Sequence, residues 1–232
     1  MKLRVMAFAA ACVLAVASLS SAQTFNEVRI SSPGAEDDVS NFFELFDVPG
    51  TSLDGLSVIV VSSEFAPGSI NNAFDLTGTS IGADGFYLAG DATEYPDADL
   101  DTTGTDYFGS PANFLLVDGF TGVAGDDLDA DDDGVIDNAL FTSVIDSLFM
   151  DDGDSDGTTA FDYGGGDSVG PDGTFTPAHV FRDVDGGGTW QIGEFGDRSF
   201  DTPGLSNVAI PEPSSIAVLG LIGLAGLGRR RR

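Results

Sequence analysis

The chain has 232 residues, a formal net charge of −29 and a single cysteine. Six of its nine Lys and Arg residues lie within the first four or the last four positions, and no Lys or Arg occurs among the 31 acidic residues between Ile30 and Phe181. Binding to phosphates or to anionic lipids requires basic side chains, so this composition excludes nucleic acid and an anionic membrane surface as direct partners of that region.

Residues 1–22 have the three parts of a secretory signal peptide. Lys2 and Arg4 form a basic start, residues 5–19 are small and apolar, and residues 20–22 provide a small-x-small cleavage site that ends at Ala22. The apolar run is shorter than the ~20 residues that cross a bilayer, so we expect cleavage rather than a permanent span. Cys12 lies within this signal, and the mature chain therefore forms no disulfide and no Cys-ligated zinc site.

Residues 23–208 are predicted to form one all-β domain. Short β-prone runs alternate with clusters of Gly, Pro and Asp, a pattern typical of a sandwich or barrel. Residues 56–61 are apolar enough for a central strand that is buried on both faces, and the eighteen Phe residues indicate a core built from aromatic rings. The expected strands cover residues 25–30, 42–46, 56–61, 73–76, 85–89, 113–117, 144–150, 179–182 and 190–192.

Three long segments, residues 91–111, 119–138 and 151–177, carry little apolar content. Loops longer than ~15 residues are uncommon in compact domains unless they are functional or held by ions. Uncompensated carboxylates repel one another, and divalent cations, salt or wide spacing must screen them. We therefore expect these segments to be long acidic insertions in the β-domain.

The segment 127–137 resembles a calcium-binding loop. Counted from its second acid, it has Asp at positions 1, 3, 5 and 9 and Gly134 at position 6. Ca²⁺ takes six to eight oxygen ligands, and a tight Gly turn brings alternate Asp side chains to one centre. Leu140 stands at position 12 in place of the bidentate acid, so the expected affinity is weak, ~10⁻⁴–10⁻³ M. The predicted ligands are Asp129, Asp131, Asp133 and Asp137.

A second segment repeats part of this pattern. Asp152, Asp154 and Asp156 stand at positions 1, 3 and 5, Gly157 follows at position 6, and Tyr163 occupies position 12. A third stretch, residues 183–194, has acids twelve positions apart but lacks the central Asp. For the first two segments we expect Ca²⁺ as the cofactor, and a solvated acidic loop is the alternative.

Catalytic patterns are weak in this sequence. His179 is the only histidine, and the mature chain has no Cys or Lys, which excludes Cys–His and Schiff-base chemistry. No G-x-S-x-G motif is present. The prediction is a protein that is not an enzyme, and the alternative is an envelope hydrolase that uses carboxylates or a bound metal.

Short motifs at both ends of residues 24–207 resemble the lamin-tail domain. An "NE" strand (Asn26, Glu27), an "F-x-E-L"-like strand at residues 43–46 and a turn at residues 53–56 look like the opening of that family. The closing motif of the family is matched by residues 181–186, Trp190 and residues 202–207. The resemblance implies an immunoglobulin-like β-sandwich, found in bacteria on secreted and surface proteins.

The last residues, 209–232, resemble the PEP-CTERM sorting signal, which an exosortase processes in that family. An apolar run at residues 216–228 would insert transiently in the inner membrane, and the Arg block would hold its end in the cytoplasm by the positive-inside rule. The alternative is an ordinary C-terminal anchor. The residues that carry the signal are Pro211, Glu212 and Pro213, and then Arg229, Arg230, Arg231 and Arg232.

Together these patterns predict an exported protein of the cell surface or extracellular matrix. Its expected role is structural or adhesive, through calcium bridges between acidic loops and an acidic extracellular polysaccharide, or through contacts with other surface proteins. A polysaccharide site with aromatic platforms is a further option, for which Trp190 and four Tyr residues are available.

Overall fold

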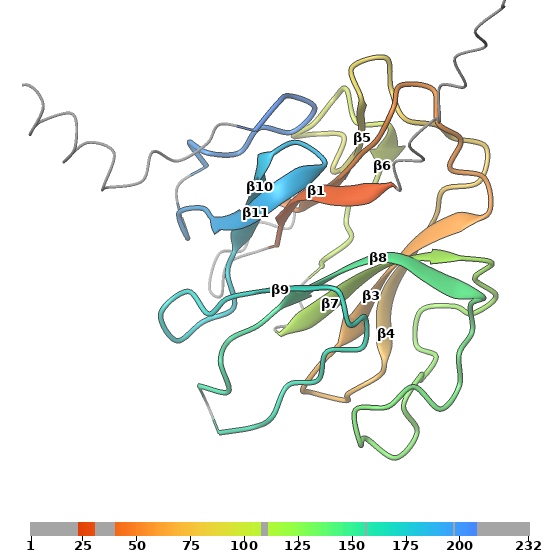
Figure 1. The fold of residues 1–232 in the computed structure, drawn as a ribbon, viewed down its shortest axis with the longest axis vertical. Helices are drawn as coiled ribbons and strands as arrows, with labels where there is room; N and C mark the ends of the chain where they lie inside the picture. The colour runs from red at the N-terminus through yellow and green to blue at the C-terminus, as the bar shows by residue number, and fades with distance from the viewer. Residues whose placement is uncertain (1–22, 31–39, 108–110, 156, 197, 208–232) are drawn as a thin grey trace, which may run out of the picture.

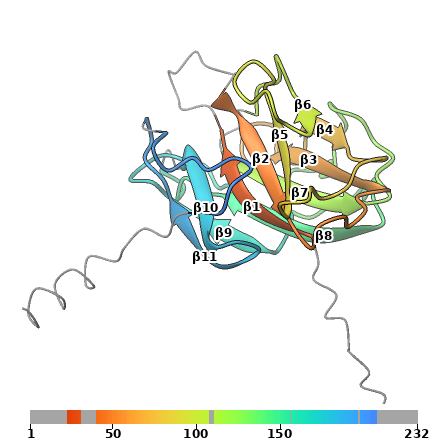
Figure 2. The ribbon, with the colours of Figure 1, turned by 90° about the horizontal axis from the view of Figure 1, so that it is seen from above.

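The computed structural model describes residues 23–30, 40–107, 111–155, 157–196 and 198–207. Two β-sheets stack face to face, as the two perpendicular views show (Figures 1 and 2). The cleavage position at Ala22, the Pro-Glu-Pro motif and the Arg block lie outside the described residues. Within the described part of the chain, no helix has the length and hydropathy needed to cross a membrane. The expected all-β class, with two sheets that fit a sandwich, is confirmed.

The first sheet has the strand order β11-β10-β1-β2-β5-β6. Neighbouring strands are antiparallel except for the β5–β6 pair, which is parallel. Glu27 is opposite both Phe181 of β10 and Glu44 of β2, so these two acids are neighbours on one face. The strands are β11 (Gly187–Ile192), β10 (His179–Val184), β1 (Thr24–Arg29), β2 (Phe42–Phe46), β5 (Phe86–Gly90) and β6 (Leu100–Asp101).

The second sheet has the strand order β4-β3-β7-β8-β9, with only the β8–β9 pair parallel. β3 lies between two partners and every one of its residues is buried, as its apolar sequence predicts. The strands are β4 (Ile70–Asp75), β3 (Leu56–Ser62), β7 (Ala112–Asp118), β8 (Ser143–Met150) and β9 (Asp167–Val169).

All nine expected strands are present, and the largest shifts are in β4 and β11, each of which begins three residues earlier than predicted. Two short strands, β6 and β9, were missed because they lie within the segments expected as loops. Each pairs in parallel with a longer strand through backbone groups over two or three residues. So short and largely polar a segment has no hydrophobic periodicity from which it could be predicted.

The main core lies between the sheets and is built largely from aromatic rings. Phe25 of β1 meets Phe114 of β7 edge to face, with 6.2 Å between ring centroids, and Tyr107 packs on the same Phe114 ring at 6.3 Å. Successive strand residues point to opposite faces, so in β2 Phe43 and Leu45 enter this core while Glu44 points outward. The aromatic core predicted from composition is therefore confirmed.

A second apolar cluster covers the outer face of the second sheet. Ile59 of β3 and Leu115 of β7 point away from the main core and pack beneath Leu128 and Tyr163. Both covering residues come from the acidic segments that follow β7 and β8. These segments thus form a layer on the sheet, and their few apolar residues explain why β3 is buried on both faces.

Candidate calcium loops and the buried polar network

Asp129 is the buried centre of the first candidate loop. One carboxylate oxygen accepts the Asp133 N–H at 3.2 Å, and the other accepts the Gly134 N–H at 2.8 Å and the Tyr163 hydroxyl at 2.7 Å. Desolvation opposes ionisation of Asp129, but these hydrogen bonds prevail and hold the pKa of its carboxyl below the usual value. The side chain is therefore an ionised, fixed acceptor at position 1 of the loop.

Two more carboxylates converge on Asp129. Oxygens of Asp131 and Asp137 lie within 4.8 Å of each other and of an Asp129 oxygen. The negative charges of Asp133 and Asp137 raise the pKa of the Asp131 carboxyl. Asp133 is adjacent but outside this group, and one of its oxygens accepts the Val135 N–H at 2.9 Å. Three of the four predicted ligands thus come together around a space that could hold a hard cation.

The base of this loop is fixed to the rest of the fold. Leu128 is fully buried, its N–H donates to the Gly68 carbonyl at 3.0 Å, and its carbonyl accepts the Asp137 N–H at 2.8 Å. Gly134 has φ of +86°, and a Cβ there would collide with the Phe161 ring. Glycine is therefore required at position 6 both by backbone conformation and by packing.

The second candidate loop has a different shape. Asp151, Asp152 and Asp154 bring oxygens within 4.8 Å of one another, whereas Asp156 lies outside the described residues. The Gly157 N–H donates to the Asp154 carbonyl at 3.0 Å, rather than to the first Asp of the loop as Gly134 does. The similar spacing in the two sequences therefore does not give the same loop geometry.

Contacts between the two loop regions were not expected from the sequence. Tyr163, which occupies position 12 of the second pattern, donates its hydroxyl to position 1 of the first, and Phe161 packs on Gly134. The sequence feature that could have indicated this contact is Tyr163, an aromatic residue at the position where a calcium-loop pattern needs an acid. The third stretch forms the β10–β11 hairpin, where Asp183 accepts the N–H and the hydroxyl of Thr189, each at 2.8 Å.

A buried charged cluster surrounds the only histidine on the outer face of the first sheet. His179 is fully buried, with Nε2 2.8 Å from a Glu27 oxygen and Nδ1 3.4 Å from an Asp201 oxygen. Arg29 and Arg198 approach the other oxygen of Asp201 at 2.7 Å and 3.1 Å. The three side chains Glu27, His179 and Asp201 could form a metal-ligating group, but opposite ring nitrogens face the two acids. The ion pairs of this cluster are those of Arg29 and Arg198 with Asp201.

The neighbouring acid, Glu44, belongs to the same network. Its oxygens accept the Asn26 side-chain amide at 2.8 Å and the Gly204 N–H at 2.6 Å. Burial raises the pKa of Glu44 well above its usual value, and the hydrogen bonds from Asn26 and Gly204 counteract part of that rise. Asn26 also accepts the Gly186 N–H at 2.9 Å. The motifs at the two ends of the domain thus meet in one buried polar network, which sequence reasoning had not placed together.

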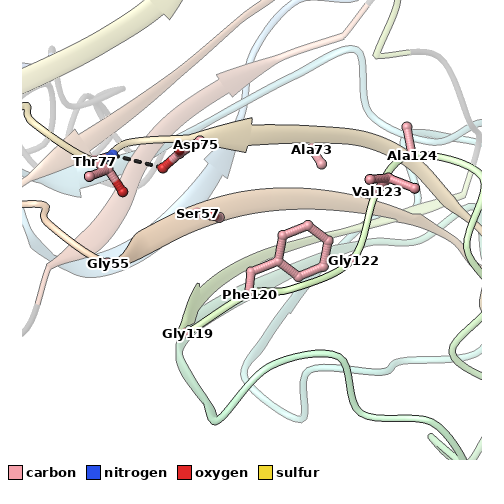
Figure 3. A pocket seen from close by; sticks show the side chains of 10 residues that line it. All are labelled: Gly55, Ser57, Ala73, Asp75, Thr77, Gly119, Phe120, Gly122, Val123 and Ala124. Atoms are coloured by element: carbon pink, nitrogen blue, oxygen red, sulfur yellow. Dashed lines mark hydrogen bonds between the residues drawn. The ribbon is translucent and has the colours of Figure 1, made fainter.

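Two of the grooves on the described surface bear on the search for a site. One, of about 460 Å³, lies on the outer face of the second sheet, where Phe120 stands on one side and the hydrogen-bonded pair Asp75–Thr77 lies near one end (Figure 3). The other, of about 650 Å³, is lined by Phe86, acids such as Asp99, and residues 203–205. His179 lines neither groove.

Comparison with known proteins identifies the end of the chain. Residues 209–232 match the model of the PEP-CTERM protein-sorting motif. Neither a curated protein nor a solved structure matches the chain. The predicted sorting signal is confirmed: the chain carries a PEP-CTERM motif, which implies an exported, membrane-transiting protein that an exosortase recognises.

Proposed function

We propose that the protein is a non-catalytic component of the cell surface or extracellular matrix, structural or adhesive, whose Asp129 loop binds Ca²⁺ weakly. The observation that carries this proposal is the convergence of the Asp129, Asp131 and Asp137 carboxylates on a fixed loop base. Mutual repulsion of these acids costs free energy that a divalent cation would relieve. The PEP-CTERM motif supports the location, because it implies export.

The position of the loop supports a bridging role. Asp129 is buried, whereas Asp131 and Asp137 are exposed at the surface. Ca²⁺ takes six to eight oxygen ligands, so a cation held by three carboxylates keeps coordination positions that face solvent. Carboxylates of an acidic polysaccharide can fill these positions, and the acidic protein surface and the acidic sugar would then be linked rather than repelled.

We also infer that the sandwich is of the immunoglobulin-like, lamin-tail type. The support is that the residues of the resemblance share one network: Asn26 and Glu27 of the opening motif bond to Gly186 and Thr202 of the closing motifs. The group around His179 does not favour a hydrolase site, because His179 is fully buried and both oxygens of Glu27 already accept hydrogen bonds from Thr202.

Thermal unfolding of the exported chain in Ca²⁺ and in NaCl of equal ionic strength tests the calcium site. A ligand of the folded state stabilises it by RT ln(1 + [L]/Kd), so 10 mM Ca²⁺ and Kd of ~10⁻⁴–10⁻³ M give about 1.4–2.7 kcal/mol. For a domain of this size that corresponds to a rise in Tm of about 3–11 °C.

Asp131→Asn together with Asp137→Asn should abolish the Ca²⁺-specific rise. The matched control is Asp84→Asn together with Asp97→Asn, which removes the same charge from exposed positions outside the loop and should keep the rise. Equal Tm shifts in Ca²⁺ and in NaCl would rule out a specific site. A matrix polysaccharide that binds the wild type only when Ca²⁺ is present would support the bridging role.

A further inference from the structure

The groove on the outer face of the second sheet lies between two strands and a loop. One side is formed by the beginning of β3 and the end of β4, and the other by residues 119–124 of the loop that follows β7 (Figure 3). Its volume of about 460 Å³ falls within the roughly 300–1,000 Å³ of ligand pockets in proteins. The groove therefore has the size for a small organic molecule or for one unit of a polymer.

Backbone hydrogen bonds fix the loop against the sheet. The Gly119 N–H donates to the carbonyl of Gly55, the residue before β3, at 3.0 Å. Beyond the other end of the groove, the Gly125 N–H donates to the carbonyl of Ile70 in β4 at 2.8 Å. A site whose walls are fixed in advance avoids the entropic cost of ordering a loop when the ligand binds.

Ser57 and Asp75 place two hydrogen-bonding side chains next to each other in this groove. They are register partners in the β3–β4 pair, and residues directly opposite each other have Cβ atoms about 4.5–5.5 Å apart. Ser57 is only 6% exposed, and none of the hydrogen bonds among the described residues involves its hydroxyl. A polar group that is withdrawn from water without a partner costs free energy. A ligand hydroxyl in the groove would supply that partner.

Asp75 is an ionised acceptor in a fixed position. One of its oxygens accepts the Thr77 N–H at 2.9 Å. Hydrogen bonds from the hydroxyl and the N–H of Thr77 hold the pKa of the Asp75 carboxyl below its usual value. A carboxylate has about four lone-pair sites, so it can accept further hydrogen bonds from a ligand. No Lys or Arg occurs among the described residues that line the groove, and an acidic ligand would therefore meet only negative charge.

Phe120 supplies an apolar surface beside these polar groups. Its ring is partly buried against the second apolar cluster, and Figure 3 shows it projecting from the loop toward β3. The face of an aromatic ring is the negative end of its quadrupole, so it attracts the weakly positive hydrogens of C–H groups. Small residues complete the groove, and a Cβ at Gly122 would lie 2.9 Å from Phe120 Cζ. Glycine at position 122 thus leaves room for the ring.

We propose that this groove binds a neutral sugar unit of a polysaccharide, with Phe120 against the C–H face of the pyranose ring and with Asp75 and Ser57 bonded to its hydroxyls. A pyranose combines an apolar face with neighbouring hydroxyls that both donate and accept, and the groove offers a partner for each. A purely apolar ligand would instead desolvate the Asp75 carboxylate without a hydrogen bond in return. The inference extends the proposed matrix role to a second site and does not depend on the calcium loop.

The test measures binding of the exported chain, in EDTA, to an array of neutral oligosaccharides built from glucose, galactose or mannose. At least one should bind, and NMR should show shifts of the Gly119 and Gly122 amides. Asp75→Ala should weaken this binding at least tenfold, because it removes a charged acceptor. Ser57→Ala and Phe120→Leu should each weaken it about two- to tenfold, the range for one neutral hydrogen bond or one aromatic contact.

The matched control is Asp101→Ala. Asp101 is exposed and accepts the Thr103 N–H at 2.9 Å in the same Asp-x-Thr arrangement as Asp75, but it lies outside the groove. Its replacement removes the same charge and the same local bond, and sugar binding should stay at the wild-type level. Asp75 is also exposed, so Asp75→Ala should fold and decides the question even if Phe120→Leu does not fold.

Three results would overturn the proposal: no binding of any neutral oligosaccharide, equal binding by Asp75→Ala and the wild type, or tighter binding of acidic oligosaccharides or of a Lys-rich peptide. Because EDTA removes Ca²⁺, the calcium proposal can fail without changing these results. Conversely, Asp131→Asn together with Asp137→Asn should leave binding of the neutral sugar unchanged.

Discussion

Replacement of Asn26 by Ala should reveal how much the buried polar network contributes to stability. The Asn26 amide donates to Glu44 at 2.8 Å and to Asp185 at 3.3 Å, and its carbonyl accepts the Gly186 N–H at 2.9 Å. The residue is fully buried, so no water would replace these bonds directly. The change leaves the Glu44 carboxyl group buried with one hydrogen-bond partner fewer.

The expected loss follows from these contacts. A hydrogen bond contributes about 0.5–1.5 kcal/mol net, and a buried group left unsatisfied costs about 1–3 kcal/mol. Because such terms are not additive, we expect the free energy of unfolding to fall by about 3 kcal/mol in total for Asn26→Ala. For a domain of this size, Tm should fall by about 6–12 °C.

Urea denaturation and calorimetry measure both quantities, and the midpoint should move while the m-value stays constant. The matched control is Asn138→Ala, because Asn138 is exposed and donates only a marginal bond, 3.5 Å long, to the Asp127 carbonyl. Surface changes of this kind usually stay within about 0.5 kcal/mol. A loss below about 1 kcal/mol for Asn26→Ala would show that the network does not stabilise the fold as argued.

Three further outcomes are expected. Burial raises the pKa of Glu44, so the folded state holds the Glu44 proton more tightly than the unfolded chain does. The free energy of unfolding should therefore decrease as pH rises from about 4.3, the ordinary pKa of Glu, through the folded-state pKa. Glu44→Gln should flatten this pH dependence, and an unchanged slope would contradict it. Deletion of Arg229 to Arg232 should leave export intact but stop surface delivery, which fractionation would detect. Circular dichroism should show β-structure, and a helix content above about a third would contradict the fold.

The strands could be predicted because each long strand carries its own signal. The run 56–61 is apolar apart from Ser57. In residues 42–46, alternate side chains place Phe43 and Leu45 on one face and Glu44 on the other, and the structure buries Phe43 and Leu45 in the main core. β6 and β9 could not be predicted, since their pairing depends on neighbouring strands rather than on their own side chains. Tertiary context, and not propensity, forms such edge strands.

The first acidic loop was predictable for a similar reason. Its glycine turn and alternate Asp residues specify a local conformation, and Asp129, Asp131 and Asp137 come together as the spacing indicates. The buried polar network was not predictable in this way. Glu27 and Thr202 are 175 residues apart, and His179 gave no sign that its ring would lie between two acids. Long-range pairing of polar groups leaves no periodic pattern in a sequence.

The distribution of positive charge divides the domain into two parts. The three Arg residues of residues 23–208 all pair with acids: Arg29 and Arg198 with Asp201, and Arg182 with Asp167. Two of them therefore neutralise acids on the outer face of the first sheet, where residues 201–207 are hydrogen-bonded. The loops over the second sheet have no basic residue among their acids. Arg182 reaches Asp167 from the neighbouring sheet, and the remaining repulsion is left to spacing and to ions from solution. Arg29 and Arg198 thus neutralise an acid in the segment that precedes the sorting signal. The acidic loops that we propose to contact the matrix depend mainly on cations from solution.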